Sequence, residues 1–445
     1  MKRSDLALTV LILVALVLGV VVGQFLLFDP SLSADKLDSI GKPWEEAGSL
    51  IFIRPLKMLI IPLVFVSVVV GVTSIGSPEK LGVLGGATLV YYITTMLLAI
   101  ALGLTLVTTI APGEGVEREE LNLNEAGLEA SREAIERGQE TGLGDAFLNL
   151  LYQMLPENPV AAAAEGNTLG VVVTALLLGL ALVLAGRAAD PAVRVFEALF
   201  SAFLMLVRWI LWLAPIGVFL LVAGKIGQVG LGQFAGPVGK YALVVLLGLA
   251  IHGVVTLPVL AFLLGKAHPG RFAWAMRKPL ITAFSTASSS GTLPITIEEA
   301  QTSGKCSKRA SNFVLPLGAT INMDGTALYQ AVAVVFLFQV YGIDLTLTQL
   351  LVILITATLS AVGAAGIPSA GLVTMAIVIT AVNKSLASLG ETVELPLAAI
   401  GIILGIDRIL DMCRTMVNVW GDSIGARIMT RLAPDTEEEL EKAAG

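Results

Sequence analysis

The sequence is short of charged residues, of cysteine and of metalloenzyme motifs. Only 14% of its 445 residues are charged and 56% are hydrophobic, whereas soluble domains average about 25% charged residues, so we expect a polytopic membrane protein. Two cysteines, Cys306 and Cys413, are too few for a disulfide scaffold, and their spacing matches no metal site. The formal charge of −7 argues against nucleic acid as a partner. No His-Glu-x-x-His pattern occurs, and we expect neither an enzyme nor an organic cofactor.

What the sequence does contain is a polar stripe in its last hydrophobic segment, from Gly405 to Gly425. Five ionic or amide residues recur there at steps of four, three, four and four, which places them on one face of a helix. They extend over about 22 Å at ~1.5 Å per residue, most of a bilayer's hydrocarbon thickness of roughly 30 Å. The residues of the stripe are Asp407, Asp411, Arg414, Asn418 and Asp422.

Two interpretations of the stripe are open. Each charge at mid-membrane costs roughly 2.5–3.5 kcal/mol on insertion scales, so the stripe needs partners. A structural network is one possibility, with Asp411 and Arg414 paired three residues apart. However, three aspartates against Arg408 and Arg414 leave one negative charge in excess. We therefore favour a site for cations and for a zwitterionic or anionic solute.

Hydrophobic segments alternate with short polar links along the chain. The first, from Leu6 to Leu27, has about 20 apolar residues and no small-residue cleavage site, so we expect a retained span rather than a signal peptide. The segment 147–184 is interrupted by polar and proline-containing clusters, which predicts two or three helical pieces. Single spans are expected at 50–74, 84–110, 195–224 and 238–265.

Charge in the links predicts the orientation. Lys2 and Arg3 place the N-terminus in the cytoplasm by the positive-inside rule. Three spans later, the segment 113–143 carries nine Glu, three Arg and no Lys, and we expect an acidic extracellular loop there. An acidic tail, 435–441, ends the chain in the cytoplasm.

Three later hydrophobic segments are broken at their middle. The segment 280–300 is interrupted by Ser, Gly and Thr at 287–292 and has basic residues on both sides, which predicts a re-entrant hairpin. The segment 311–341 contains a polar break at 322–326, and 349–382 is cut by glycines and Pro368, which predicts a second hairpin. Broken backbone at membrane depth is tolerated only inside protein or along a cavity, so the two hairpin tips should meet at a binding site.

The half-helices of these segments predict how the site would work. Helix N-termini at 288–290 and after Pro368 would offer free amides to an anion. Unwound carbonyls around 322–325 and 363–366 would coordinate a cation such as sodium.

Four motifs carry a family resemblance: SSSGTLP at 288–294, NMDGTALYQ at 322–330, GIPSAG at 366–371 and DRILDMCRTMVNVWGD at 407–422. Together with RPLKMLIIP at 54–62 and LPENP at 155–159, the chain resembles the dicarboxylate/amino acid:cation symporter family, in particular prokaryotic sodium-coupled aspartate/glutamate transporters, which are homologues of neuronal glutamate transporters. The resemblance covers nearly the whole chain. Inverted repeats are already known in this family, so the match to that pattern is not an independent prediction.

The resemblance implies an all-α fold with eight transmembrane helices, two re-entrant hairpins, inverted repeats and elevator-type movement. It also implies a homotrimer in the inner membrane of a prokaryote, with both termini cytoplasmic. The expected division is a scaffold at 1–75 and 146–228, the latter part trimerising, and a transport domain at 76–112 and 229–432. The acidic loop occupies 113–145 and the acidic tail 433–445.

The resemblance also assigns site residues. Asp411 would bind the substrate amino group and Arg414 its side-chain carboxylate, in a bidentate fork. The expected substrate-binding residues are Ser289, Thr326, Ile367, Gly371, Asp411, Arg414, Thr415 and Asn418. The expected sodium ligands are Gly318, Asn322, Asn418 and Asp422 in one site; Asp324, Asn322, Tyr92 and Thr95 in a deeper one; and Thr320, Met323, Ala361, Val362 and Ala364 around a third.

These residues predict an importer of L-aspartate, with L-glutamate left open, coupled to sodium. A dicarboxylate without an amino group would leave Asp411 unpaired, and a neutral amino acid would leave Arg414 unpaired. The alternative is a proton-coupled symporter of glutamate, aspartate or C4-dicarboxylates with the same fold, motivated by His252 and by Met96, which stands where a hydroxyl ligand is expected. An anion channel is a further alternative. Ala287, Arg408 and Gln330 are other departures from the family pattern.

Overall fold

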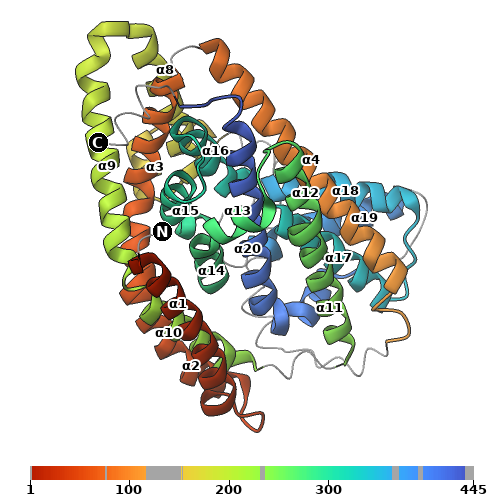
Figure 1. Cartoon of the computed structure of the whole chain (residues 1–445). Helices are drawn as coiled ribbons and strands as arrows, with labels where there is room; N and C mark the ends of the chain where they lie inside the picture. The colour runs from red at the N-terminus through yellow and green to blue at the C-terminus, as the bar shows by residue number, and fades with distance from the viewer. Residues whose placement is uncertain are drawn as a thin grey trace.

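Every element in the part of the chain that the structure describes is a helix. The computed structural model describes residues 3–75, 78–116, 152, 154–230, 236–362, 370–388 and 394–435. Figure 1 shows α20 running through the middle of the molecule, with the other helices arranged around it. The predicted all-α fold is confirmed for these residues.

Six helices lie along one side of the molecule in two groups. The first group consists of α1 (Arg3–Val22), α2 (Ala34–Gly48) and α10 (Ala214–Val229), and the second of α3 (Arg54–Ile75), α8 (Thr168–Ala185) and α9 (Asp190–Leu211). Small residues let the helices of the first group approach closely. A Cβ atom added to Gly41 would lie 2.5 Å from the carbonyl oxygen of Gly224. A side chain at either glycine would push α2 and α10 apart.

The other side of the molecule is built around α17. This helix is buried almost throughout and packs against α4, α11, α18, α19 and α20. The elements involved are α4 (Pro78–Ile110), α11 (Gly236–Ile251) continued by the π-helical turn η6 (His252–Thr256) and α12 (Leu257–Leu263), α17 (Asp324–Val340), α18 (Leu347–Val362), α19 (Ala370–Ser388) and α20 (Leu404–Met429).

The first predicted hairpin is present. Helices α14 (Arg277–Thr286) and α15 (Ser289–Thr302) pack against each other and are joined at Ala287, which has the left-handed angles φ 48 and ψ 38. The Lys278 ammonium lies 2.6 Å from the Glu299 carboxylate, so the two ends far from the turn meet and the helices are antiparallel. The Ser288 side chain caps α15 by accepting from the Gly291 N–H at 3.0 Å.

The second predicted hairpin is confirmed in its two helices. Helices α18 and α19 pack together, and Gln330 of α17 contacts both, since it accepts from Ser360 Oγ at 3.2 Å and donates to Thr374 Oγ1. The predicted break at 363–369 lies outside the described residues. Helix α19 begins at Ala370, close to Pro368 as expected.

The predicted break in the segment 311–341 is also confirmed. Helix α16 (Lys308–Ile321) ends at Asn322, whose angles are φ −92 and ψ 94, and α17 begins at Asp324. Interruptions of the same kind separate α7 (Pro159–Ala164) from α8 in the earlier segment. Each of these breaks was visible in the sequence as polar residues or prolines where an unbroken span would be apolar.

Three expectations about helix boundaries were wrong. The segment 195–224 is not one span, because α9 ends at Leu211 and α10 begins at Ala214; Pro215 has no N–H for the Leu211 carbonyl. The stripe helix begins at Leu404 rather than near 395, after the 3-10 helix η7 (Leu397–Ile403). The first hairpin, expected at 280–300, begins at Arg277, so Lys278, one of the basic residues expected beside it, is buried inside it. Helix α13 (Pro269–Ala275) precedes this hairpin.

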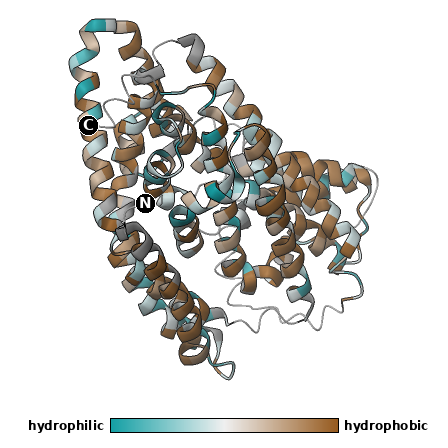
Figure 2. Ribbon diagram, in the orientation of Figure 1, coloured by the Kyte–Doolittle hydropathy of each residue, from teal (hydrophilic) through white to brown (hydrophobic). Residues whose placement is uncertain are grey.

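Figure 2 shows that hydrophobic residues predominate in many helices, and many large hydrophobic side chains are exposed. Among the described residues, five segments are long and apolar enough to cross a bilayer. These segments are Val10–Leu27, Leu81–Ile110, Gly170–Val207, Val238–Leu263 and Lys308–Val340. The chain is therefore a multi-pass helical membrane protein, and the number of eight spans stays a prediction.

Candidate functional site

The polar stripe lies on the buried face of α20. Its five residues are each at most 4% exposed, although the helix crosses the middle of an apolar protein. Four- and three-residue spacing keeps them on one face, so a single helix presents three carboxylates, one guanidinium and one amide to the same region. The stripe predicted from the sequence is therefore present as one continuous surface.

Arg414 is held between two of the aspartates. Its Nε donates to Asp411 Oδ1 at 2.9 Å, and its Nη1 donates to Asp407 Oδ1 at 3.1 Å. The guanidinium carbon lies 4.2 Å from the centre of the Tyr329 ring, and the Tyr329 hydroxyl donates to Asp407 Oδ1 at 2.6 Å. The structural network considered above thus exists, and it fixes the direction of the guanidinium in the absence of any other partner.

Two glycines bring backbone against Arg414. A Cβ atom at Gly371, in α19, would lie 3.1 Å from Arg414 Nη1, so the second hairpin closes directly over the guanidinium. A Cβ atom at Gly325 would lie 2.4 Å from the Arg414 carbonyl oxygen. Thr415 lies beside the Asp411–Arg414 pair, with its hydroxyl 3.5 Å from Asp411 Oδ1. Three predicted substrate residues, Gly371, Arg414 and Asp411, are therefore together.

Asn418 connects α20 to the start of α17. Its Oδ1 accepts from the Gly325 N–H at 2.7 Å, and its Nδ2 donates to Thr326 Oγ1 at 3.1 Å and points to Met323 Sδ at 3.3 Å. Thr326 is 6% exposed and belongs to the same cluster. Ser289 begins α15 at the tip of the first hairpin, and it is buried.

The first predicted cation site is assembled from three helices. Asn322 Nδ2 donates to Asp422 Oδ1 at 2.9 Å, across 100 residues of sequence. A Cβ atom at Gly318 would lie 2.5 Å from Asp422 Oδ1 and 2.6 Å from the Tyr92 hydroxyl oxygen. Only glycine therefore fits at position 318 of α16 without displacing these two oxygens.

The deeper predicted site contains a contact that the sequence did not reveal. His252 Nε2 lies 3.3 Å from Asp324 Oδ2, and both side chains are fully buried. Asp324 Oδ1 has no hydrogen-bond partner among the described residues, and Thr95 Oγ1 lies 3.4 Å from Asn322 Oδ1 nearby. Met96, like Thr95, is fully buried. His252 is thus a hydrogen-bonded residue of this site.

The third predicted site is only partly described. Thr320 donates to the Leu317 carbonyl at 3.0 Å, and Ala361 is fully buried near the end of α18. Val362 is the last residue of α18. The predicted ligand Ala364 and the predicted substrate residue Ile367 lie outside the described residues, as does the side chain of Arg408.

The buried charges do not balance within this site. Four buried carboxylates line this site: Asp324, Asp407, Asp411 and Asp422. Among the side chains that the structure describes, Arg414 pairs with Asp407 and Asp411, whereas Asp324 and Asp422 have no guanidinium or ammonium partner. Buried charge without compensation is costly in an apolar protein. The described residues hold no cluster of three His, Cys, Asp or Glu side chains suited to a tightly bound metal. Carboxylate, amide and carbonyl oxygens suit hard cations such as sodium.

Sequence reasoning missed Tyr329 and the role of Asp407. Tyr329 follows Thr326 by three residues, so both lie on one face of α17, and this spacing was the available signal. It also overlooked that residues 421–425, Gly-Asp-Ser-Ile-Gly, match the letters of the hydrolase pattern Gly-x-Ser-x-Gly. Ser423 lies inside α20 and donates to the Val419 carbonyl at 2.7 Å, not at a strand-to-helix turn, so the match has no catalytic geometry.

Comparison with known proteins places this geometry. The family model described as the sodium:dicarboxylate symporter family matches residues 8–432. The neutral amino acid transporter B(0) of Oryctolagus cuniculus is 38% identical over 87% of this chain and 73% of its own length. The human B(0) protein is 37% identical over 92% of this chain and 76% of its own length. The excitatory amino acid transporter 3 of Mus musculus is 35% identical over 96% of this chain and 86% of its own length.

Proposed function

The chain belongs to the sodium:dicarboxylate symporter family, and from that premise we propose that it imports L-aspartate, with L-glutamate left open, together with sodium ions. The observation that carries the proposal is the Arg414 guanidinium, buried, aimed by Asp407 and Tyr329, and covered by Gly371 of the second hairpin. A planar guanidinium in such a place matches a carboxylate in a bidentate fork.

In this proposal Asp411 exchanges partners when the substrate binds. Asp411 leaves Arg414 Nε for the substrate amino group, while Arg414 keeps Asp407 and takes the side-chain carboxylate of the substrate. Thr415, Thr326 and Asn418 supply polar contacts around the α-carboxylate, with Ser289, Gly371 and Ile367 contributing backbone from the two hairpin tips. An acidic amino acid therefore pairs both charged groups.

The cations would occupy the two clusters of oxygens beside this pocket. Asp422, Asn322, Asn418 and the Gly318 carbonyl would hold one sodium ion, and Asp324, Asn322, Tyr92 and Thr95 a second. Thr320, Met323, Ala361, Val362 and Ala364 would surround a third. Asp324 and Asp422, which contact no guanidinium among the described side chains, support this assignment, because sodium ions would offset their charge.

A second candidate is supported by the relatives. The B(0) proteins are named as neutral amino acid transporters, and a neutral amino acid would leave Arg414 with Asp407 as its partner. We prefer the acidic substrate, because its side-chain carboxylate would pair with the Arg414 guanidinium, whereas a neutral side chain would not.

Uptake by purified protein in liposomes tests these alternatives. We expect an inward sodium gradient to drive accumulation of labelled L-aspartate and to leave labelled L-alanine largely outside. A proton gradient is imposed separately. Accumulation driven by protons without sodium would support the proton-coupled alternative, preferential alanine uptake the neutral one, and ion flux without solute accumulation a channel.

The assembly and movement are also part of the proposal. Residues 1–75 and 146–228 would form a trimeric scaffold, past which 76–112 and 229–432 move as an elevator. The grouping of α1, α2 and α10, and of α3, α8 and α9, along one side is consistent with this division. Cytoplasmic termini and a prokaryotic inner membrane rest on the basic start of the chain and on the motif resemblance.

A further inference from the structure

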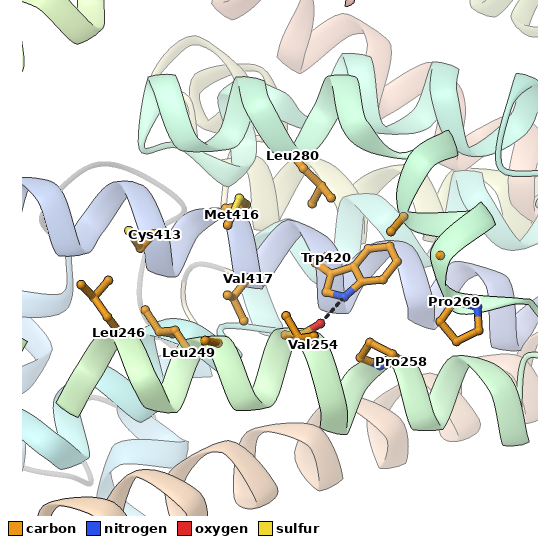
Figure 3. A pocket seen from close by; sticks show the side chains of 14 residues that line it. Leu246, Leu249, Val254, Pro258, Pro269, Leu280, Cys413, Met416, Val417 and Trp420 are labelled. Carbon is orange, nitrogen blue, oxygen red and sulfur yellow. Dashed lines mark hydrogen bonds between the residues drawn. The ribbon is translucent and has the colours of Figure 1, made fainter. Parts of the chain in front are cut away.

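An apolar cavity of about 540 Å³ lies beside α20, the helix that carries the polar stripe. Figure 3 shows Cys413, Met416 and Trp420 of α20 facing Leu249 and Val254 of the helix opposite, with Leu280 of the first hairpin above them. At 100° per residue, the α20 residues of this cavity point to the side opposite the stripe. The cavity is thus separate from the proposed substrate and cation sites.

The lining of this cavity offers no polar partner to a ligand. All fourteen lining residues have apolar or glycine side chains, apart from the thiol of Cys413 and the indole N–H of Trp420. The indole is already used, because Trp420 Nε1 donates to the Gly253 carbonyl at 2.9 Å, as the dashed line in Figure 3 marks. An occupant would therefore bind by hydrocarbon contact alone.

Two glycines in the cavity wall have space beside them for a side chain. A Cβ atom at Gly253 would meet only Val417 Cγ2, at 3.6 Å, and one at Gly270 would meet only the His268 ring, at 3.7 Å or more. On the stripe side, a Cβ atom at Gly421 would lie 2.7 Å from Asp324 Oδ2. The glycines of the cavity are therefore not required by close packing, unlike those of the polar site.

The mouth of the cavity opens on the exposed face of a candidate membrane span. Helices α11 and α12 with η6 form the candidate membrane span Val238–Leu263. Apart from Lys240 near its start, its strongly exposed side chains are apolar: Val254 is 74% exposed, Val255 54% and Phe262 61%. Val254 belongs both to this outer face and to the cavity wall, so hydrocarbon outside is continuous with the space inside.

We propose that this cavity binds an acyl chain of a membrane lipid, seated between α11–α12 and the back of α20. The volume lies in the range of about 300–1,000 Å³ typical of small-molecule sites, and the site has no group that would select a head group. The bound chain would press against Met416 and Trp420 and so support the helix that carries the stripe.

Photolabelling tests the proposal independently of transport. The full-length protein is reconstituted with a phosphatidylcholine that carries a diazirine in its acyl chain, irradiated, and mapped by mass spectrometry. We expect adducts at residues 413–420 and 246–258. The Gly253→Leu variant places a side chain in the cavity, and its labelling there should fall at least about tenfold, since each excluded methylene weakens binding roughly fourfold.

The matched control is Val255→Leu, on the same turn but directed to the outer face, which should leave labelling unchanged. Equal labelling of the Gly253→Leu variant, or adducts confined to the outer face, would overturn the proposal. A second measurement covers a folding failure of that variant. It uses the Cys306→Ala protein, in which Cys413 is the remaining cysteine. Lipid added to the delipidated protein should slow alkylation of the Cys413 thiol. The proposal that the cavity holds a lipid chain would be wrong if lipid left the alkylation rate unchanged, or if two copies of the protein cross-linked through Cys413.

Discussion

Arg414 shows that the role of a side chain in binding depends on the direction in which its donor groups point. Its Nε and Nη1 are directed to two different aspartates, and the ring of Tyr329 lies against its plane. A lysine would place one ammonium in this space and would satisfy at most part of these contacts. The identity of the substrate therefore rests on the shape of the cation as well as on its charge.

Replacement of Arg414 by lysine should weaken L-aspartate uptake strongly. Loss of one partner of a buried charge pair costs about 2–5 kcal/mol, so the concentration for half-maximal uptake should rise at least about thirtyfold. The control is Arg427→Lys, since Arg427 bonds the Lys305 carbonyl away from the stripe. Unchanged aspartate uptake in the Arg414→Lys variant would mean that the guanidinium does not bind the substrate.

Tyr329→Phe should show whether Asp407 positions the guanidinium. The variant keeps the ring over Arg414 and removes only the 2.6 Å hydrogen bond to Asp407. Hydrogen bonds to charged groups contribute about 1.5–3 kcal/mol, so we expect aspartate affinity to fall at least about tenfold in a binding titration. Tyr152→Phe, at an exposed position, serves as the control. An affinity equal to that of the unmodified protein would show that the tyrosine is only a packing residue.

Gly318→Ala tests the first cation site. The added methyl group would lie within 2.6 Å of both Asp422 Oδ1 and the Tyr92 hydroxyl oxygen, so it should exclude a cation. We expect the sodium concentration for half-maximal aspartate binding to rise sharply. Gly86→Ala, which meets nothing within 4 Å, should not change it. The same sodium requirement in both variants would place the cation elsewhere.

Among the elements, the first hairpin stores strain at its tip. Ala287 adopts a left-handed conformation that costs an L-residue roughly 1–2 kcal/mol, and it connects two helices whose far ends are held by Lys278 and Glu299. The capped start of α15 follows at once. The turn therefore delivers the amides of α15 to the site at some cost in stability.

Ala287→Gly should relieve this strain. Glycine adopts the left-handed region freely, so we expect the free energy of unfolding to rise by about 1 kcal/mol, measured as a higher thermal midpoint in detergent. Ala283→Gly, inside α14, should change it in the opposite direction, because glycine lowers helix stability by about 1 kcal/mol. A shift of the same sign in both variants would contradict the strained turn.

At the scale of the whole molecule, excess negative charge connects folding to ligand binding. Four buried carboxylates from α17 and α20 lie along the site and Arg414 pairs with two of them, so cations should stabilise the folded protein as a unit. The same helices pack against both hairpins. Substrate and sodium should therefore act on global stability and not only on one loop.

Thermal unfolding should depend on sodium and aspartate together. A ligand at one hundred times its dissociation constant adds about 2.7 kcal/mol to stability, so sodium with L-aspartate should raise the midpoint by several degrees. Potassium with L-aspartate is the comparison, and we expect it to give little change. Equal stabilisation by both salts would argue against sodium as the coupling ion.

The sequence by itself determined the local features of this protein. The spacing of the stripe on α20 and the breaks at Asn322 and Ala287 follow from residues near one another in the chain, because helical geometry converts spacing into direction. Those predictions are confirmed in the described residues. The kink before Pro215 and the start of α20 at Leu404 were misjudged, since apolarity alone does not reveal where a helix ends.

Only the tertiary structure decided which of these groups meet. Asp407 and Tyr329 are 78 residues apart, and His252 lies against Asp324 from a third helix. Only the family resemblance had grouped Asn322 with Asp422, which are 100 residues apart and joined by a hydrogen bond. No periodicity relates such residues. Their contacts depend on the distance and angle at which helices cross, which is determined by packing, as where Gly325 lets α17 lie against the backbone of α20.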